Sequence, residues 1–86
     1  MDLEPLLRYW TLQSPDGRVA TCELVRTAHG LEVRCDWSGA GAQACVSRTA
    51  PIEAVSDALA VAEAWRAAYL QEGWVARAPR YPRPVP

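Results

Sequence analysis

Three cysteines and one histidine are the residues of this sequence best suited to metal binding or nucleophilic chemistry. Cys22, Cys35 and Cys45 are separated by 13 and 10 positions, which fits neither a CxxC-type zinc site nor a disulfide framework. We therefore expect three free thiols that pack as small apolar side chains in the core. A zinc site completed by His29 and redox chemistry of the thiols are the two alternatives.

His29 falls in a predicted turn, where an exposed imidazole is the ordinary outcome. General base catalysis would need a nucleophile or a carboxylate within hydrogen-bond reach. The sequence contains no G-x-S-x-G elbow, HExxH, P-loop or G-x-G-x-x-G pattern. It also lacks lysine, so amine nucleophiles are excluded. These observations predict a protein that is not an enzyme and that needs neither a cofactor nor a metal.

Charged residues offer candidates for binding rather than for catalysis. Glu32, Arg34 and Asp36 alternate with apolar residues, so they should share the solvated face of a strand and form cross-strand ion pairs there. Arg66 falls within the apolar arc of a predicted helix. Its stem should therefore lie at the edge of the core, with the guanidinium reaching outward toward Glu63.

The last ten residues, 77–86, supply the remaining partner-binding candidates, Arg77, Arg80 and Tyr81. Four Pro and three Arg among them predict an extended or disordered tail outside a single domain of residues 1–76. The tail contains a PxxP pattern, the form that polyproline ligands take. Without the tail, six Arg stand against ten acids, so the net charge of the body is −4, whereas the whole chain carries −1.

Four strands are expected to position the candidates in the first half of the chain. Leu31, Val33, Cys35 and Trp37 alternate with charged residues, and this period of two predicts one buried and one wet face, as in an antiparallel sheet. A hairpin turn is predicted where Ser14-Pro15-Asp16-Gly17 interrupts the apolar runs. The other predicted strands span residues 6–13, 19–26 and 43–48.

A helix should follow, because the apolar period changes after Pro51. Thr49 is the expected cap, Pro51 is tolerated in the first turn, and Gly73 supplies the C-terminal cap on which Trp74 can pack. The expected apolar stripe on this helix consists of Ile52, Val55, Leu59, Ala62, Trp65 and Tyr69.

The predicted fold class is α+β, a four-stranded antiparallel meander (ββββα) with one C-terminal helix packed on one sheet face. Short connections make sequential strands antiparallel neighbours.

The segment Trp37-Ser38-Gly39-Ala40-Gly41-Ala42-Gln43, preceded by strands and followed by a helix ending at Gly73-Trp74, resembles the WGR domain. That family has a Trp-Gly-Arg turn at the end of a strand, then a Gly-Gln pair, a strand and a closing helix. The resemblance spans residues 9–74 and implies contact with DNA. Ser38 and Gly39 stand where the family has Gly-Arg, the turn is shorter, and the basic residues that grip phosphates are missing.

The functional prediction is a small non-catalytic binding module that acts through protein–protein contact and regulates or inhibits a larger partner, as phage- and immunity-type inhibitors do. A homodimer through the open sheet face or an edge strand is a subsidiary possibility. The alternative is a nucleic-acid-binding accessory domain that uses Arg residues and exposed aromatic side chains. No stretch of 18 apolar residues occurs, so no membrane contact is expected. The acidic N-terminus lacks the features of a secretory signal, which predicts a cytoplasmic location.

Overall fold

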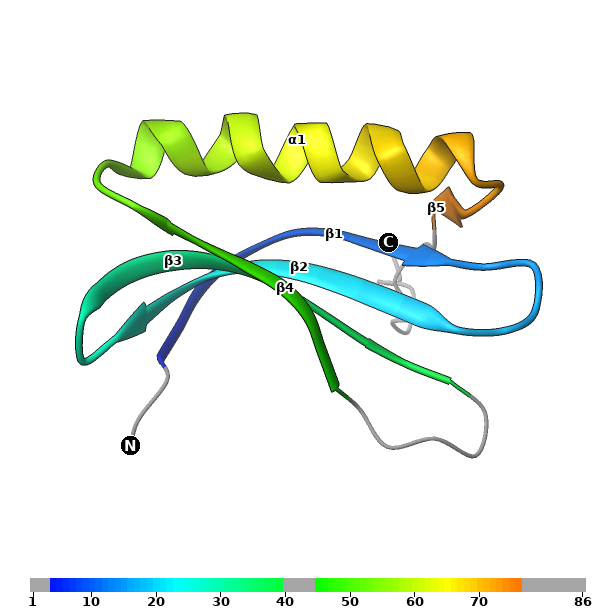
Figure 1. Cartoon of the computed structure of the whole chain (residues 1–86), viewed down its shortest axis with the longest axis horizontal. Coiled ribbons are helices and arrows are strands. Elements are labelled where there is room, and N and C mark those ends of the chain that lie inside the picture. The colour runs from blue at the N-terminus through cyan, green and yellow to red at the C-terminus, as the bar shows by residue number, and fades with distance from the viewer. Residues whose placement is uncertain (1–3, 40–44, 77–86) are drawn as a thin grey trace, which may run out of the picture.

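A computed structural model describes residues 4–39 and 45–76, and this part of the chain forms a five-stranded antiparallel sheet with one helix (Figure 1). The α+β class is as predicted. The order of the strands across the sheet is β4-β3-β2-β1-β5. The elements are β1 (Glu4–Gln13), β2 (Val19–Thr27), β3 (Gly30–Ser38), β4 (Cys45–Ile52), α1 (Val55–Gln71) and β5 (Val75–Ala76).

The fourth strand and the start of the helix differ from the prediction. β4 extends to Ile52, so Thr49 and Pro51 lie in the strand and neither of them starts the helix. Pro51 lies opposite Glu32 and is tolerated because β4 is the outer strand of the described sheet. The helix begins after Ala54, which makes no side-chain hydrogen bond to cap it.

The sheet also has a fifth strand that the prediction missed. β5 is two residues long and pairs with Leu12 and Gln13 of β1. A strand of this length has no periodicity of its own, so the sequence carried no signal for it.

The turn between β1 and β2 is confirmed. The Ser14 N–H donates to the carbonyl oxygen of Arg18 at 2.8 Å, and the Gly17 N–H donates to that of Ser14 at 3.0 Å. Gly17 has a φ of 95°, in the region that only glycine adopts without strain. The turn fixes the register of β1 against β2.

The predicted faces of β3 are also confirmed. Cys35 lies opposite Cys22 of β2, and Val33 lies opposite Leu24. All four of these side chains are buried in the core beneath α1. Leu31 and Trp37 are partly buried and pack against the same core, so every apolar residue of this set contacts the core.

The predicted apolar stripe is confirmed in part: Ala62 and Tyr69 are buried and Trp65 packs against the core, but Val55 and Leu59 do not. Ala58 and Ala62 are fully buried, whereas Val55 and Leu59 are 54% and 53% exposed. Two small residues let α1 lie close to the sheet. The indole of Trp10 then fits beneath the helix, where its Nε1–H donates to the carbonyl oxygen of Ala62 at 2.8 Å.

The C-terminal end of α1 is capped as predicted. Gly73 has a φ of 97°, and the Trp74 N–H donates to the carbonyl oxygen of Tyr69 at 3.2 Å. The Trp74 side chain is 5% exposed, and its ring centroid lies 4.8 Å from that of Tyr69. Trp74 therefore closes this end of the core. Crossing a bilayer demands a longer and more apolar helix than any found in residues 4–39 and 45–76.

Candidate functional site

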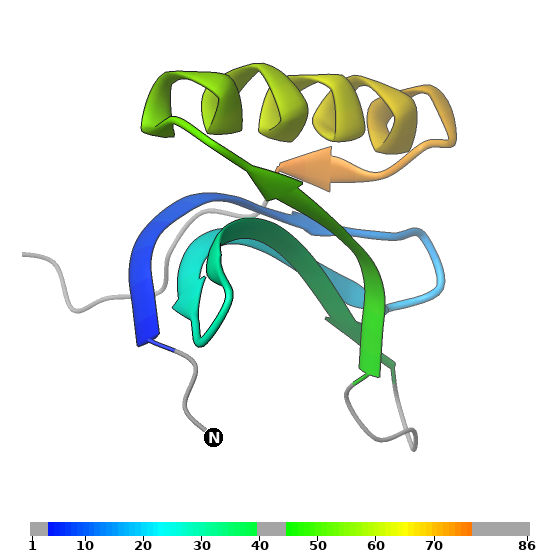
Figure 2. The ribbon, with the colours of Figure 1, turned by 60° about the vertical axis from the view of Figure 1, so that its left-hand side comes forward.

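The face of the sheet opposite α1 has no covering element within the described part of the chain. In the views of Figures 1 and 2, the ends of β1 and β4 bend away from the helix, so this open face lies on the concave side. Two rows of side chains cross it. Arg8, Glu23 and Arg34 form one row, and Thr21 and Asp36 belong to the next.

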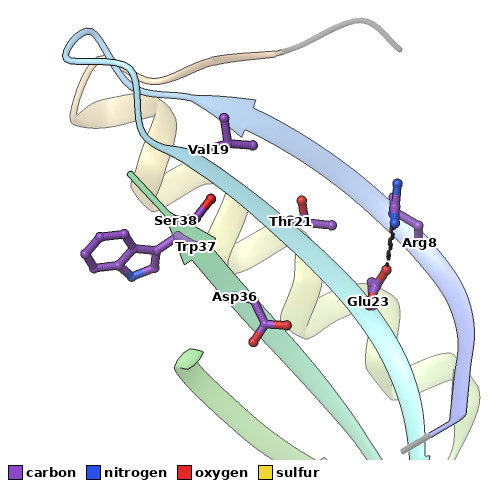
Figure 3. Close-up of a pocket in the computed structure, with 7 residues that line it drawn as sticks. All are labelled: Arg8, Val19, Thr21, Glu23, Asp36, Trp37 and Ser38. Carbon is purple, nitrogen blue, oxygen red and sulfur yellow. Dashed lines mark hydrogen bonds and ion pairs between the residues drawn. The ribbon is translucent and has the colours of Figure 1, made fainter. Parts of the chain in front are cut away.

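A shallow depression of about 250 Å³ lies in this open face (Figure 3). It draws residues from three neighbouring strands, and most of the side chains are polar. Figure 3 shows Thr21, Glu23 and Asp36 along β2 and β3, with α1 behind the sheet. The lining residues are Arg8, Val19, Thr21, Glu23, Asp36, Trp37 and Ser38.

Two ion pairs neutralise most of the charge on this face. Arg8 bonds to Glu23 across the strands, with an Nη2–Oε2 distance of 3.1 Å. Arg34 bonds to Glu32 of its own strand, with an Nη2–Oε2 distance of 3.3 Å, and both side chains are only 22% exposed. Glu32, Arg34 and Asp36 are thus half-buried, not fully solvated as expected, and the Arg34 pair runs along the strand and not across it.

Two polar atoms at this face are shielded from solvent and unpaired. Asp36 Oδ1 and Arg34 Nε have no hydrogen-bond partner among residues 4–39 and 45–76. Leaving a buried polar group unsatisfied costs about 1–3 kcal/mol, and native proteins contain few such groups. The open face therefore carries one acceptor and one donor that the described chain does not use.

The electrostatics of Asp36 agree with this geometry. Burial raises the pKa of the Asp36 carboxyl, and the negative charge of Glu23 raises it further, while the nearby guanidinium of Arg34 opposes the rise. Because the two ion pairs cancel, the charge left over at this face is that of Asp36. A cationic or hydrogen-bond-donating group brought to Asp36 would be stabilised there.

The other predicted binding residues lie elsewhere. Arg66 is on α1, on the far side of the sheet from Asp36, and its Nη1 lies 3.8 Å from Glu63 Oε1. This ion pair was predicted and is confirmed. Arg77, Arg80 and Tyr81 lie outside the described residues. The structure thus brings together only the three strand residues of the predicted set.

Sequence reasoning missed Arg8, Thr21, Glu23 and Ser38. The alternation of β2 gave a usable signal, because Ala20, Cys22 and Leu24 lie in the core under α1, which places Thr21 and Glu23 on the opposite face.

Arg8 could not be found in the same way. It is two residues from Trp10 and should share its face, but a register shift between Arg8 and Trp10 places the two on opposite sides.

The cysteines are positioned for packing. Cys22 and Cys35 are both fully buried, and Cys35 Sγ lies 3.6 Å from Tyr69 Oη. Burial raises the pKa of Cys22 to about 12, which disfavours the reactive thiolate. His29 is exposed in the turn between β2 and β3. The side chain of Cys45 lies outside the described part.

The arginines of the described chain are all engaged. Four of them form ion pairs with acids, namely Arg8, Arg26, Arg34 and Arg66. Arg18 pairs with Asp16 and lies over Trp37 and Trp74, its Cζ 5.3 Å from each ring centroid. Arg48 Cζ lies 5.5 Å from the Trp65 ring and 5.6 Å from the Tyr69 ring. These contacts leave no uncommitted guanidinium in residues 4–39 and 45–76.

The chain matches no protein-family model, no curated protein and no solved structure. The resemblance to the WGR domain therefore carries no family assignment.

Proposed function

We propose that this chain is a non-catalytic binding module whose open sheet face docks onto a larger protein and regulates or inhibits it. The observation that carries the proposal is the pair of shielded, unpaired atoms, Asp36 Oδ1 and Arg34 Nε. A partner whose docking opens access to these atoms, donates a hydrogen bond to the first and accepts one from the second removes two unsatisfied groups at once. Protein surfaces offer donors and acceptors side by side.

A protein partner is favoured over nucleic acid by the state of the arginines. Binding to phosphate needs cations that can exchange their counterions for the nucleic-acid backbone. Every arginine in the described ranges already has an acid or an aromatic ring as its partner. The unpaired charge at the open face belongs to Asp36, which repels phosphate.

The aromatic side chains also favour a protein partner over nucleic acid. Single-stranded nucleic acids stack their bases on exposed rings. Trp10, Tyr69 and Trp74 are buried, and arginines lie over Trp37 and Trp65. The nucleic-acid alternative thus rests on the tail, and a gel-shift titration against salt tests it: binding that weakens steeply as salt rises would favour it.

A homodimer is the subsidiary proposal. β4 is an outer strand, and β5 covers only Leu12 and Gln13 of the neighbouring β1 edge, so both edges leave backbone groups without a strand beside them in the described sheet. Sedimentation of the purified chain at several concentrations tests this possibility.

The test of the main proposal is capture from the source cell with matched surface variants. One bait is the wild type, one combines Asp36→Ala with Arg34→Gln on the open face, and the control is Leu59→Ala on the exposed face of α1. A captured protein counts only if the open-face variant loses it and the control keeps it.

Purified components then give the affinity. The open-face variant should bind at least about tenfold more weakly, which is about 1.4 kcal/mol. If the Leu59→Ala control lost the partner and the open-face variant kept it, the proposal would be wrong.

A further inference from the structure

We propose that the depression in the open face holds the ammonium group of a lysine side chain that the partner protein contributes. The groups that bind it are the carboxyls of Glu23 and Asp36 and the hydroxyl of Thr21, which line the depression together (Figure 3). This inference rests on the proposed function, because it names the chemistry of the partner at the same face. It depends on the geometry of the three groups, on their unused oxygens and on the charge of the face.

The three groups come from neighbouring positions on two strands. Thr21 of β2 lies directly opposite Asp36 of β3, and Glu23 is two residues further along β2 on the same face. Directly opposite side chains have Cβ atoms about 5 Å apart, and diagonal neighbours are about 7 Å apart. The negative charge of Glu23 raises the pKa of the Asp36 carboxyl, so the two carboxyls are close enough to interact. A cation between them is attracted by both.

Each carboxyl has one oxygen open to a ligand in the depression. Arg8 bonds to Glu23 Oε2 through both Nε and Nη2, which leaves Glu23 Oε1 without a hydrogen bond from the described residues. Among the oxygens of these three acceptor side chains, only Asp36 Oδ1 is both shielded and unpaired, and it is not part of this site. The site consists of the three oxygens that remain accessible and unpaired in residues 4–39 and 45–76, namely Glu23 Oε1, Asp36 Oδ2 and Thr21 Oγ1.

An ammonium group fits these oxygens better than a guanidinium does. Arginine binds a carboxylate most strongly through two parallel hydrogen bonds to its two oxygens. Neither carboxyl offers both oxygens, because Arg8 holds one of Glu23 and one of Asp36 is shielded. An ammonium is compact, and its three N–H donors point in different directions. It can therefore bond to one oxygen of each of the three side chains.

The charge of the face and the composition of the chain indicate where the lysine comes from. The two ion pairs of this face cancel, so Asp36 leaves one negative charge, which a single lysine neutralises. Val19 lines the same depression and offers apolar surface to the lysine stem. This chain contains no lysine, so a second copy cannot supply the side chain. The occupant therefore belongs to a different protein.

The test titrates the full chain with a lysine probe and follows the backbone amide signals by NMR. The probe is Nα-acetyl-lysine methylamide, and its matched controls are the norleucine analogue, which lacks the ammonium, and the arginine analogue. The lysine probe should shift the amide signals of Thr21, Glu23 and Asp36 with millimolar affinity, while those of the β2–β3 turn stay in place. The arginine analogue should bind at least about threefold more weakly, and the norleucine analogue should cause no shift.

Two variants test the residues of the site. Glu23→Gln combined with Asp36→Asn removes both negative charges and should weaken binding of the lysine probe at least about tenfold. Leu59→Ala on α1 should bind the probe as the wild type does. The proposal is overturned if the lysine probe causes no saturable shift at the depression, if either analogue binds as well, or if the double variant keeps the wild-type affinity. The comparison of the three probes needs only the wild type, so it decides even if a variant fails to fold.

A second experiment separates this inference from the proposed function. The lysines of the source-cell extract are acetylated before capture, which removes their charge. A protein that the wild type captures through the open face should then be lost. If it is still captured, the lysine assignment is wrong and the proposed function stands. If the probe binds but no captured protein depends on the open face, the proposed function is wrong and the lysine site stands.

Discussion

The two faces of the sheet differ in how completely the chain satisfies its own polar groups. Under α1, the indole N–H of Trp10 has the Ala62 carbonyl as its acceptor, and Cys35 lies beside the Tyr69 hydroxyl. On the open face, Asp36 and Arg34 each keep a shielded polar atom without a partner in the described chain. The helix side is thus complete in itself and supplies stability, whereas the open side is incomplete and is the better candidate for binding.

Removing the central aromatic of the helix side should have the largest effect. Trp10 is 7% exposed and lies between the sheet and α1. Trp10→Ala should lower the free energy of unfolding by about 3–5 kcal/mol, the usual cost of truncating a buried aromatic. Urea unfolding monitored by circular dichroism measures this change in the free energy of unfolding. A loss in unfolding free energy below about 1 kcal/mol would mean that the helix side of the sheet does not determine the stability of the fold.

Trp74 should come next, paired with deletion of residues 77–86 as its control. Trp74→Ala removes the side chain that closes the helix end, and we expect a loss of about 2–3 kcal/mol. The tail has little apolar content to offset the cost of ordering its backbone, so deleting it should cost less than about 1 kcal/mol. Thermal unfolding of both variants also tests whether the domain ends between Trp74 and Arg77. The reverse order of effects would make the tail structural.

Two substitutions on α1 test which of its side chains lie against the sheet. Ala62→Leu adds volume where α1 lies against Trp10, so it should destabilise the fold by about 1–3 kcal/mol. Leu59→Ala removes a side chain that is more than half exposed and should change stability by no more than about 0.5 kcal/mol. A loss of more than about 1 kcal/mol for Leu59→Ala in chemical denaturation would indicate that Leu59 is buried, as expected from the sequence.

On the open face, the smallest stability effect is expected, and its sign is informative. The pKa of Asp36 is raised in the folded state, so its carboxylate form opposes folding above that pKa, and this cost is relieved as pH falls through it. Asp36→Asn should therefore leave stability at neutral pH unchanged or slightly higher. The wild type should gain stability as pH falls from the folded-state pKa of Asp36 to its unfolded-state pKa, and Asp36→Asn should remove this gain. A clear loss at neutral pH would mean that Asp36 has a structural partner.

The parts of the fold that follow from period-two alternation could be predicted from the sequence. The strict alternation in β3 assigned its faces correctly, and the Pro-Asp-Gly turn located the first hairpin. The start of α1 could not be predicted, because a Pro after Thr-Ala suits both a first helical turn and an edge strand.

The predicted helix stripe was wrong at Val55 and Leu59 for a different reason. Val55 and Leu59 are more apolar than Ala58, yet the size of Trp10 requires a small residue opposite it. Packing volume between distant segments overrode the local pattern there.

The candidate site was partly predictable for similar reasons. Alternation along β3 identified Glu32, Arg34 and Asp36. The position of Arg8 beside Glu23 depends instead on the register shift between Arg8 and Trp10. That irregularity reverses the faces of β1 and has no clear signature in the sequence. Asp36 lies on β3 between Thr21 of β2 and Val46 of β4, so its environment depends on strands that are separate in the sequence.

The most direct test of the account is photo-cross-linking from the two faces in the source cell. A photoreactive amino acid is placed at Ser38 beside the depression in one variant and at Leu59 on the outer face of α1 in another. Our account predicts a discrete cross-linked product from position 38, weakened by Arg34→Gln, and none from position 59. A product from position 59 alone would contradict it.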